Sequence, residues 1–263
     1  MSIVPWEVLL ALEQVRTHLH DVGADIEPQS LRSAVRHYIE TPGKLLRPLL
    51  LLTFSYSIDR RSLIDPKILQ AATIVELLHI VSLLQDDVVD KHDERRGVKT
   101  PRALYGDGKS ILASDWLIAE SIKRAIELGP EIVEYLADVA QRLSVGQALD
   151  LDGEQERVAE FKTAPLIEAS LVLPTLLLGR RDIIETAKRL GRSLGVLYQY
   201  SDDFSDERIE RSDVTAVVTE IKGLLGRLRN TLGEAFAPFE KLAKTLVEKA
   251  LEGSLTVARR FIT

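Results

Sequence analysis

The sequence predicts an all-α protein, a bundle of about ten helices joined by short connections. Apolar residues recur at helical spacing along most of the 263 residues, and no segment shows a convincing alternation of apolar and polar residues. Aromatic residues form only 5% of the chain, which suits helices that pack through Leu, Ile, Val and Ala. The length allows one large domain or two tightly joined ones, and we expect residues 1–263 to form a single domain.

Glycine and proline set the boundaries of the expected helices. Gly43 interrupts the chain after the second helix, Pro66 opens the longest one, and Gly129-Pro130 separates two others. Residues 92–101 form a polar loop with Gly97 and Pro101 as helix breakers. The expected helices cover 5–21, 28–40, an apolar stretch after Gly43 to about Tyr56, 66–91, 109–128, 131–150, a helix from Pro165, 182–205, 214–229 and 235–261.

Composition and charge exclude several classes of protein. The chain has no cysteine, so disulfides, thiolate catalysis and zinc–thiolate sites are excluded. A formal net charge of −6 gives no reason to expect binding to nucleic acid. The N-terminal residues lack the basic region of a secretion signal, and the apolar runs are too short or too interrupted to span a bilayer. We expect a cytoplasmic protein with no stable membrane insertion.

Two groups of three aspartates each follow an apolar helical segment. In the first group, Asp86 and Asp90 lie one turn apart on the same helix face. Close carboxylates repel one another, so the fold needs a cation or basic side chains beside them. Mg²⁺ prefers carboxylate oxygens and leaves positions for water and phosphate, so we predict that Mg²⁺ binds between the two groups. The groups are Asp86, Asp87 and Asp90, and Asp202, Asp203 and Asp206.

Two basic pairs accompany these acids. Lys44 and Arg47 lie three residues apart where a helix begins, and Arg95 and Arg96 follow the first aspartate group. Arginine forks and helix N-termini bind phosphate well. Together, the acids and bases suit one diphosphate bound through metal and a second diphosphate held without metal.

The order of these motifs resembles that of the trans-isoprenyl diphosphate synthases, which condense allylic diphosphates with isopentenyl diphosphate. The resemblance extends from about Gly43 to Asp206. It implies an all-α bundle around a central cavity, of the isoprenoid synthase type. In pattern the chain is similar to archaeal medium- or long-chain and geranylgeranyl diphosphate synthases.

The resemblance assigns roles to residues of this chain. GKLLRP resembles the isopentenyl diphosphate motif, and both aspartate groups resemble the Asp-rich motifs whose carboxylates bind Mg²⁺. GQALD, with Gly146, Gln147 and Asp150, resembles the family's GQ segment. The implied isopentenyl diphosphate site contains Gly43, Lys44, Arg47, His79 and Arg96, and the implied allylic site contains Arg95, Lys162, Thr163 and Gln199. The implied catalytic residues are Asp86, Asp87, Asp90, Lys162, Gln199 and Asp202, and all six motif aspartates are implied metal ligands.

The implied mechanism needs no nucleophilic side chain. Metal ions promote ionisation of the allylic diphosphate, and the double bond of isopentenyl diphosphate attacks the resulting carbocation. The departing diphosphate then accepts a proton. Positioning and electrostatics supply the catalysis, and an apolar interior protects the cation from water.

Product length is expected to depend on the helix before Asp86. In the family, an aromatic residue four or five positions before the first aspartate closes the cavity early. Here these positions hold Ser82 and Val81, so the cavity is expected to extend towards Leu78 and beyond. We predict a product longer than farnesyl diphosphate, of hexaprenyl type, with the geranylgeranyl product as the alternative.

The sequence also departs from the family pattern. Gln85 stands where the family usually has histidine, and the lysine-rich segment after the second Asp-rich motif is missing. Arg208, Arg211 or Lys222 are candidates to replace its lysines. A homodimer is expected, since Asp115 fits a family position on the dimer-interface helix. The alternatives are a terpene cyclase, a partner subunit of a heteromeric synthase and a helical scaffold protein.

Overall fold

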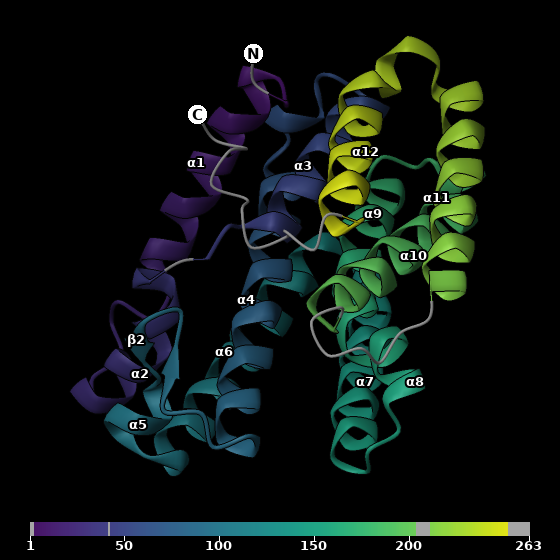
Figure 1. The fold of residues 1–263 in the computed structure, drawn as a ribbon. Coiled ribbons are helices and arrows are strands. Elements are labelled where there is room, and N and C mark those ends of the chain that lie inside the picture. Colours follow the sequence, from purple (N-terminus) through teal and green to yellow (C-terminus); the bar gives the residue numbers. More distant parts are fainter. Residues whose placement is uncertain (1–2, 42, 204–210, 252–263) are drawn as a thin grey trace.

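The computed structural model describes residues 3–41, 43–203 and 211–251, with only the backbone described at 155–156, 201–203 and 211–212. This part of the chain contains ten helices of twelve or more residues, which confirms the predicted all-α bundle (Figure 1). They are α1 (Trp6–Asp21), α2 (Gln29–Glu40), α3 (Leu46–Ile58), α4 (Pro66–Val89), α6 (Asp107–Leu128), α7 (Pro130–Leu151), α9 (Ala164–Leu177), α10 (Ile184–Asp203), α11 (Arg211–Leu232) and α12 (Ala237–Leu251).

Helix α4 is the centre of the fold. It packs against α1, α3, α6 and α9, and Figure 1 shows α1 and α2 on one side of it and α7 and α10 on the other. Pro66 lies in its first turn, where the carboxylate of Asp65 accepts a hydrogen bond from the Lys67 amide at 2.9 Å. By length and composition alone α4 could cross a membrane, but 78% of its most apolar window is buried within the protein. It is therefore a core helix.

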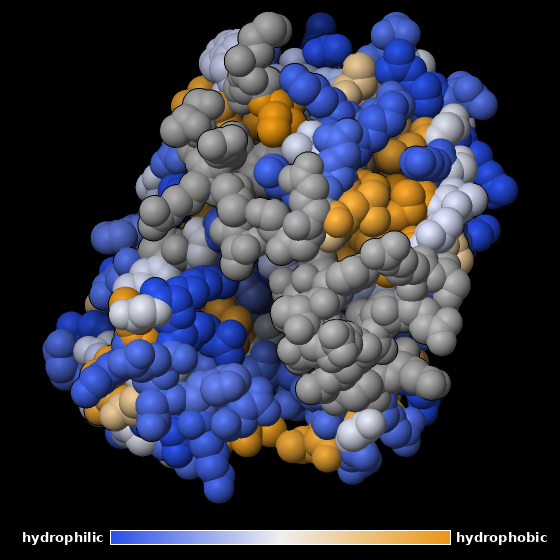
Figure 2. All heavy atoms as spheres, viewed as in Figure 1, coloured by the Kyte–Doolittle hydropathy of each residue, from blue (hydrophilic) through white to orange (hydrophobic). Residues whose placement is uncertain are grey.

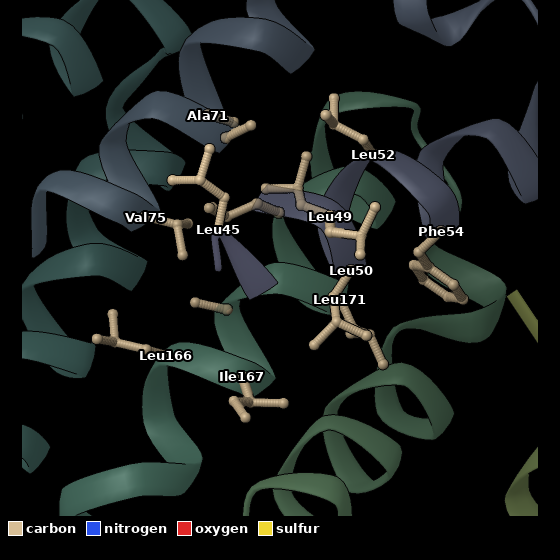
Figure 3. Packing of buried hydrophobic residues seen from close by; sticks show 14 of the residues in the cluster. Leu45, Leu49, Leu50, Leu52, Phe54, Ala71, Val75, Leu166, Ile167 and Leu171 are labelled. Atoms are coloured by element: carbon tan, nitrogen blue, oxygen red, sulfur yellow. The ribbon is translucent and has the colours of Figure 1, made fainter. Parts of the chain in front are cut away.

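The core joins helices that are far apart in the sequence. Figure 3 shows Leu49 and Leu50 of α3 packed near Val75 of α4 and Leu171 of α9. These four side chains are at most 2% exposed. On the outside, the face shown in Figure 2 is mainly hydrophilic over α2 and α5, and an apolar area lies between α11 and α12. The burial of α3, α4 and α9 against one another fixes the helices that position the candidate site.

Helices α9 and α10 form an antiparallel hairpin with a close backbone approach. A Cβ atom on Gly191 would lie 2.5 Å from Cα of Glu168, and one on Gly195 would lie 2.4 Å from Cα of Ala164. Only glycine allows this approach at both positions. The chain direction of α10 then brings Gln199 to the start of α9.

The polar loop expected at residues 92–101 contains a small β-hairpin, so the expectation of no strands was wrong there. Strand β1 (Glu94–Arg95) pairs antiparallel with β2 (Val98–Lys99), with Arg95 opposite Val98. Arg96 and Gly97 have φ values of 55° and 79°, as a two-residue turn between such strands requires. Strands of two residues are too short to show an alternating pattern.

Short elements complete the fold. Helix α5 (Pro101–Tyr105) precedes α6, and α8 (Gln155–Val158) leads into a π-helical turn, Ala159–Thr163. The 3₁₀ turns are η1 (Ser62–Ile64), η3 (Arg181–Ile183) and η5 (Gly233–Phe236). The predicted helix at 235–261 corresponds to η5 and α12, and residues beyond Leu251 lie outside the described part.

Candidate active site

A cavity of about 570 Å³ lies among α4, α6 and α7, with a polar end and an apolar end. At the polar end, seven residues predicted from the sequence meet from five different elements of the structure. They are Arg47 of α3, His79 and Asp86 of α4, Arg95 of β1, Lys162 and Thr163 of the π-helical turn, and Gln199 of α10. The fold thus assembles in space what the sequence places up to 152 residues apart, from Arg47 to Gln199.

Lys162 joins two carboxylates at the polar end. Its Nζ lies 2.6 Å from Oδ2 of Asp150 and 3.6 Å from Oδ1 of Asp86. Burial alone would lower the pKa of Lys162, but the Asp150 hydrogen bond and the nearby carboxylates outweigh it, so the pKa lies above its ordinary value. The ammonium is therefore charged at neutral pH and available to a phosphate oxygen.

The π-helical turn sets the direction of Lys162 and Thr163. Gly146 of α7 lies so close that an added Cβ would be 2.3 Å from the Phe161 carbonyl carbon and 2.4 Å from the Lys162 nitrogen. The Thr163 hydroxyl donates a hydrogen bond of 2.5 Å to Oε1 of Gln199. Single π-helical turns of this kind are frequent at functional sites.

Asp87, expected from the resemblance to bind metal, is fully buried and does not line the cavity. One carboxylate oxygen accepts a hydrogen bond from the Tyr38 hydroxyl of α2, and the other accepts one from Nε of Arg95 at 2.8 Å. Through these two hydrogen bonds Asp87 holds Arg95 in place, and its predicted role as a metal ligand stays a prediction. Tyr38 was missed because its position on the buried face of α2 resembles that of an ordinary core residue.

His79 lies among cationic side chains. Burial lowers the pKa of its imidazole well below 6.5, and the charges of Arg47, Arg96 and Arg95 lower this pKa further. The ring is therefore neutral at neutral pH and donates a single N–H. The Ser82 hydroxyl donates a hydrogen bond of 2.8 Å to the His79 carbonyl oxygen.

Replacing His79 with glutamine is expected to make the free energy of unfolding less dependent on pH below about pH 6.5. Because the folded-state pKa is depressed, only the unfolded chain gains this proton as the pH falls below about 6.5. The wild-type free energy of unfolding should therefore fall relative to the variant by up to about 1.4 kcal/mol per pH unit below about 6.5. Urea unfolding of both proteins between pH 8 and pH 5 measures this difference. Parallel profiles over the whole range would contradict it.

The remaining predicted phosphate-binding residues lie beside the cavity lining. A Cβ on Gly43 would lie 2.3 Å from a guanidinium nitrogen of Arg96, so the Arg96 side chain passes directly against Gly43. Lys44 is exposed, and Leu45 between Lys44 and α3 has a positive φ of 49°. Arg47 lines the cavity, and its buried Nε has no hydrogen-bond partner among the described residues. This donor is available to an anion in the cavity.

The predicted metal ligands are only partly described. Asp86 is the one acidic residue among the described residues that line the cavity. The Asp90 side chain is 32% exposed, and Asp90 directly follows the last residue of α4. The side chains of Asp202 and Asp203 and the whole of Asp206 lie outside the described residues. Within the described part, no three His, Cys, Asp or Glu side chains are grouped to hold a metal ion. The roles of these aspartates stay predictions.

The apolar end of the cavity defines its depth. Leu78, Val81 and Ser82, the predicted product-length residues, all line it, and Leu78 is the first residue of α4 to do so among those described. From Asp86 to Leu78 the helix rises by about 12 Å. The far end is enclosed by α6 and α7 through Ala125, Val133 and Leu136.

Two of the sequence departures can be placed. Gln85 lines the cavity and donates a hydrogen bond of 3.0 Å to the Ser114 hydroxyl of α6. Lys222 is exposed on α11, whereas Arg208 and the side chain of Arg211 lie outside the described residues. The replacement for the missing lysines therefore stays a prediction.

Comparison with known proteins yields a consistent group of relatives. A family model described as polyprenyl synthetase matches residues 28–215. The chain is 33% identical over 210 residues to a geranylgeranyl pyrophosphate synthase of Geoglobus acetivorans, covering 73% of this chain and 64% of the relative. It is 30% identical over 191 residues to a nonaprenyl diphosphate synthase of Mycobacterium tuberculosis, covering 67% and 55%. The chain thus spans less than two thirds of the length of these two relatives.

A solved structure shares the fold. It is that of an isoprenoid synthase family member from Thermotoga neapolitana, with a TM-score of 0.77 and 24% sequence identity. The match covers 91% of this chain and 99% of that structure. The arrangement of the helices around the cavity is therefore shared with this fold.

Proposed function

Because the chain belongs to the polyprenyl synthetase family, we propose that it is a Mg²⁺-dependent prenyltransferase acting as one domain over residues 1–263. It condenses isopentenyl diphosphate with an allylic diphosphate and releases diphosphate. The observation that carries this proposal is the cavity, which joins a cationic end containing Asp86 to an apolar end. A diphosphate head and a hydrocarbon tail need these two environments in this order.

The allylic diphosphate is held by residues of α10, the π-helical turn and the β-hairpin. Lys162 and Arg95 supply positive charge, and Thr163 and Gln199 supply hydrogen-bonding groups. Arg95 is fixed by Asp87, so little side-chain entropy is lost when it binds phosphate. In the absence of substrate, Lys162 is paired with Asp86 and Asp150.

Isopentenyl diphosphate binds on the other side of the polar end. Arg47 offers its unpartnered Nε, Arg96 lies against Gly43, and Lys44 adds charge. His79 stays neutral and donates one hydrogen bond. These groups would place the double bond near the allylic carbon, and the apolar lining excludes water from the carbocation.

The first Asp-rich group fits Mg²⁺ through two residues. Burial raises the pKa of Asp86 despite the neighbouring Lys162 and Arg95, so its carboxylate would gain from a divalent cation. Asp86 and Asp90 would hold Mg²⁺, and Asp202, Asp203 and Asp206 are proposed to complete the binding site. The metal would neutralise charge on the departing diphosphate. Asp87 is proposed to position Arg95.

The cavity supports a shorter product than the hexaprenyl type expected from the sequence. One isoprene unit spans about 5 Å when extended, from four carbon–carbon bonds of about 1.5 Å. One helical turn rises by about 5.4 Å, so each turn of α4 accommodates about one unit. A barrier at Val81 or Ser82 gives farnesyl diphosphate in the family, and the lining here ends one turn earlier in the sequence, at Leu78. We favour the twenty-carbon geranylgeranyl product.

Replacing Val81 with phenylalanine is expected to shorten the product by about one isoprene unit, to fifteen carbons. The ring would fill the cavity one turn above Leu78. The matched change in the opposite direction is Leu78→Ala, which should lengthen the product. Chromatography of dephosphorylated products from labelled isopentenyl diphosphate measures both. An unchanged product with Val81→Phe would contradict the assignment of α4 as the wall along which the chain grows.

We also propose that the protein is a homodimer formed through α6. Ile111, Leu112, Ile122 and Ile126 are each at least 49% exposed and recur at helical spacing. Large apolar side chains gathered on one helix face mark an interaction surface. Asp115 lies on the same face and is exposed.

The function is tested by incubating purified protein with Mg²⁺, labelled isopentenyl diphosphate and, separately, dimethylallyl, geranyl and farnesyl diphosphates. Incorporation of label into a longer prenyl diphosphate is the expected result. No incorporation with any primer would overturn the proposal. Cyclised hydrocarbon without use of isopentenyl diphosphate would indicate a terpene cyclase, which Arg47 and His79 in the cavity argue against.

A further inference from the structure

Glu168 is a fully buried carboxylate on the apolar helix α9. It lies outside the cavity lining and six residues after Lys162. A buried carboxylate is costly unless it is paired and hydrogen-bonded, so its partners indicate what it holds together.

The first partners of Glu168 are on α7. Arg142 makes a two-pronged contact, with Nη2 at 2.8 Å from Oε1 and Nη1 at 3.1 Å from Oε2. The Tyr135 hydroxyl donates to Oε1 at 3.2 Å. A fork of this kind fixes both distance and orientation between two helices.

The third partner is on α10. Nε of Arg192 lies 3.5 Å from Oε2 of Glu168, and its Nη1 lies 3.2 Å from Glu160 in the π-helical turn. At the same level, Gly191 allows the backbones of α9 and α10 to touch at Glu168. Glu168 thus links α7, α9 and α10 directly, and Arg192 extends this link to the turn that carries Lys162.

These are the elements that carry most of the proposed allylic site. Asp150 lies eight residues after Arg142 on α7, and Gln199 lies seven residues after Arg192 on α10. Lys162 and Thr163 immediately precede α9. The groups proposed for isopentenyl diphosphate are instead on α3, α4 and the segments around Gly43 and Arg96. Within the part of the chain that the structure describes, the hydrogen bonds and ion pairs of the Glu168 carboxylate go to α7 and α10 and not to these elements.

We propose that Glu168 is a positioning residue that sets the affinity for the allylic diphosphate and not for isopentenyl diphosphate. The two ligands named here rest on the proposed function. It fixes the three helices so that Lys162, Thr163 and Gln199 converge on one diphosphate. Small displacements of such groups strongly weaken binding.

The test compares Glu168→Gln with the wild type. The amide has the same shape but leaves Arg142 and Arg192 without a buried counter-charge. Calorimetry at saturating Mg²⁺ measures the Kd of farnesyl diphosphate and of isopentenyl diphosphate separately. We expect the Kd of farnesyl diphosphate to rise about tenfold and the Kd of isopentenyl diphosphate to change by less than about twofold. In steady state, the KM for the allylic primer should rise more than kcat falls.

Two further variants distinguish the proposed positioning role of Glu168 from a purely structural role. Arg142→Met should weaken farnesyl diphosphate binding to a similar extent, and the double variant should be no weaker than either single one, because the two residues act as a unit. Phe239→Leu disturbs the aromatic cluster with Phe54 and Phe236, outside the cavity lining. It should lower the melting temperature without changing either Kd.

The outcomes separate the two proposals. Equal loss of affinity for both diphosphates, or a lower melting temperature with both Kd values unchanged, would overturn the inference about Glu168. A wild type that binds both diphosphates but forms no product would overturn the proposed reaction, while the Kd values still decide the role of Glu168. A wild type that binds neither would overturn both.

Discussion

Replacing Asp86 with asparagine is expected to lower kcat by at least about a hundredfold. Among the described residues, Asp86 contributes the one carboxylate of the cavity lining, and it lies 3.6 Å from Lys162. The asparagine has the same shape but cannot carry the negative charge that a divalent cation needs. Steady-state assay with farnesyl and isopentenyl diphosphates over a range of Mg²⁺ concentrations measures the loss.

The same substitution should leave the melting temperature unchanged or higher at pH 7.5. Burial raises the pKa of Asp86 above 3.8, so its ionised form is less favourable in the folded protein than in the unfolded chain. This cost is present at every pH well above the pKa and disappears with the charge. A stability gain together with a loss of activity is characteristic of a functional site.

Asp93→Asn is the matched control for this experiment. Asp93 is exposed and pairs with Arg102 at 2.7 Å, close in sequence but outside the cavity lining. Loss of this ion pair should change the free energy of unfolding by less than about 1 kcal/mol and leave kcat unchanged. Full activity of Asp86→Asn would contradict the proposed metal site, as would a similar loss of activity in both variants.

Replacing Gly146 with alanine is expected to destabilise the protein by about 1–3 kcal/mol and to raise the KM for the allylic primer. The new Cβ would lie 2.3 Å and 2.4 Å from backbone atoms of Phe161 and Lys162, which cannot move as the end of a side chain can. The π-helical turn must shift, and Lys162 and Thr163 shift with it. Urea unfolding and steady-state kinetics measure the two effects.

Gly223→Ala provides the control for the glycine substitution itself. Gly223 is also inside a long helix, α11, but a Cβ there meets no atom within 4 Å. Because alanine favours the helical conformation, this variant should be more stable by about 0.5–1 kcal/mol with unchanged kinetics. A Gly146→Ala protein that behaves like Gly223→Ala would show that the close approach is not needed.

The long helices and much of the site could be predicted because their signals are local. Pro66 opens α4 as expected, and the motif spacing placed Arg47, His79, Asp86 and Lys162 at what is one cavity in space. Motif residues are set by chemistry that the sequence displays directly. The strands around Arg96 were not predicted, because two residues cannot show a period.

The partners of Asp87 and of Glu168 could not be predicted from the sequence. An aspartate in an acidic motif looks the same whether it faces a cavity or the Tyr38 hydroxyl of another helix. Glu168 lies in an apolar segment, and its ion pair with Arg142 spans 26 residues and depends on how α7 and α9 pack. Such contacts arise from tertiary packing, which no local pattern records.

The apolar character of α4 has a consequence for the biogenesis of the protein. Its 24 residues leave the ribosome before α6 and α9, which later cover them. During synthesis at about 5–20 residues per second, this segment is exposed for several seconds with the composition of a membrane span. The helix that forms the wall of the cavity is therefore an apolar target for chaperones until α6 and α9 have been made.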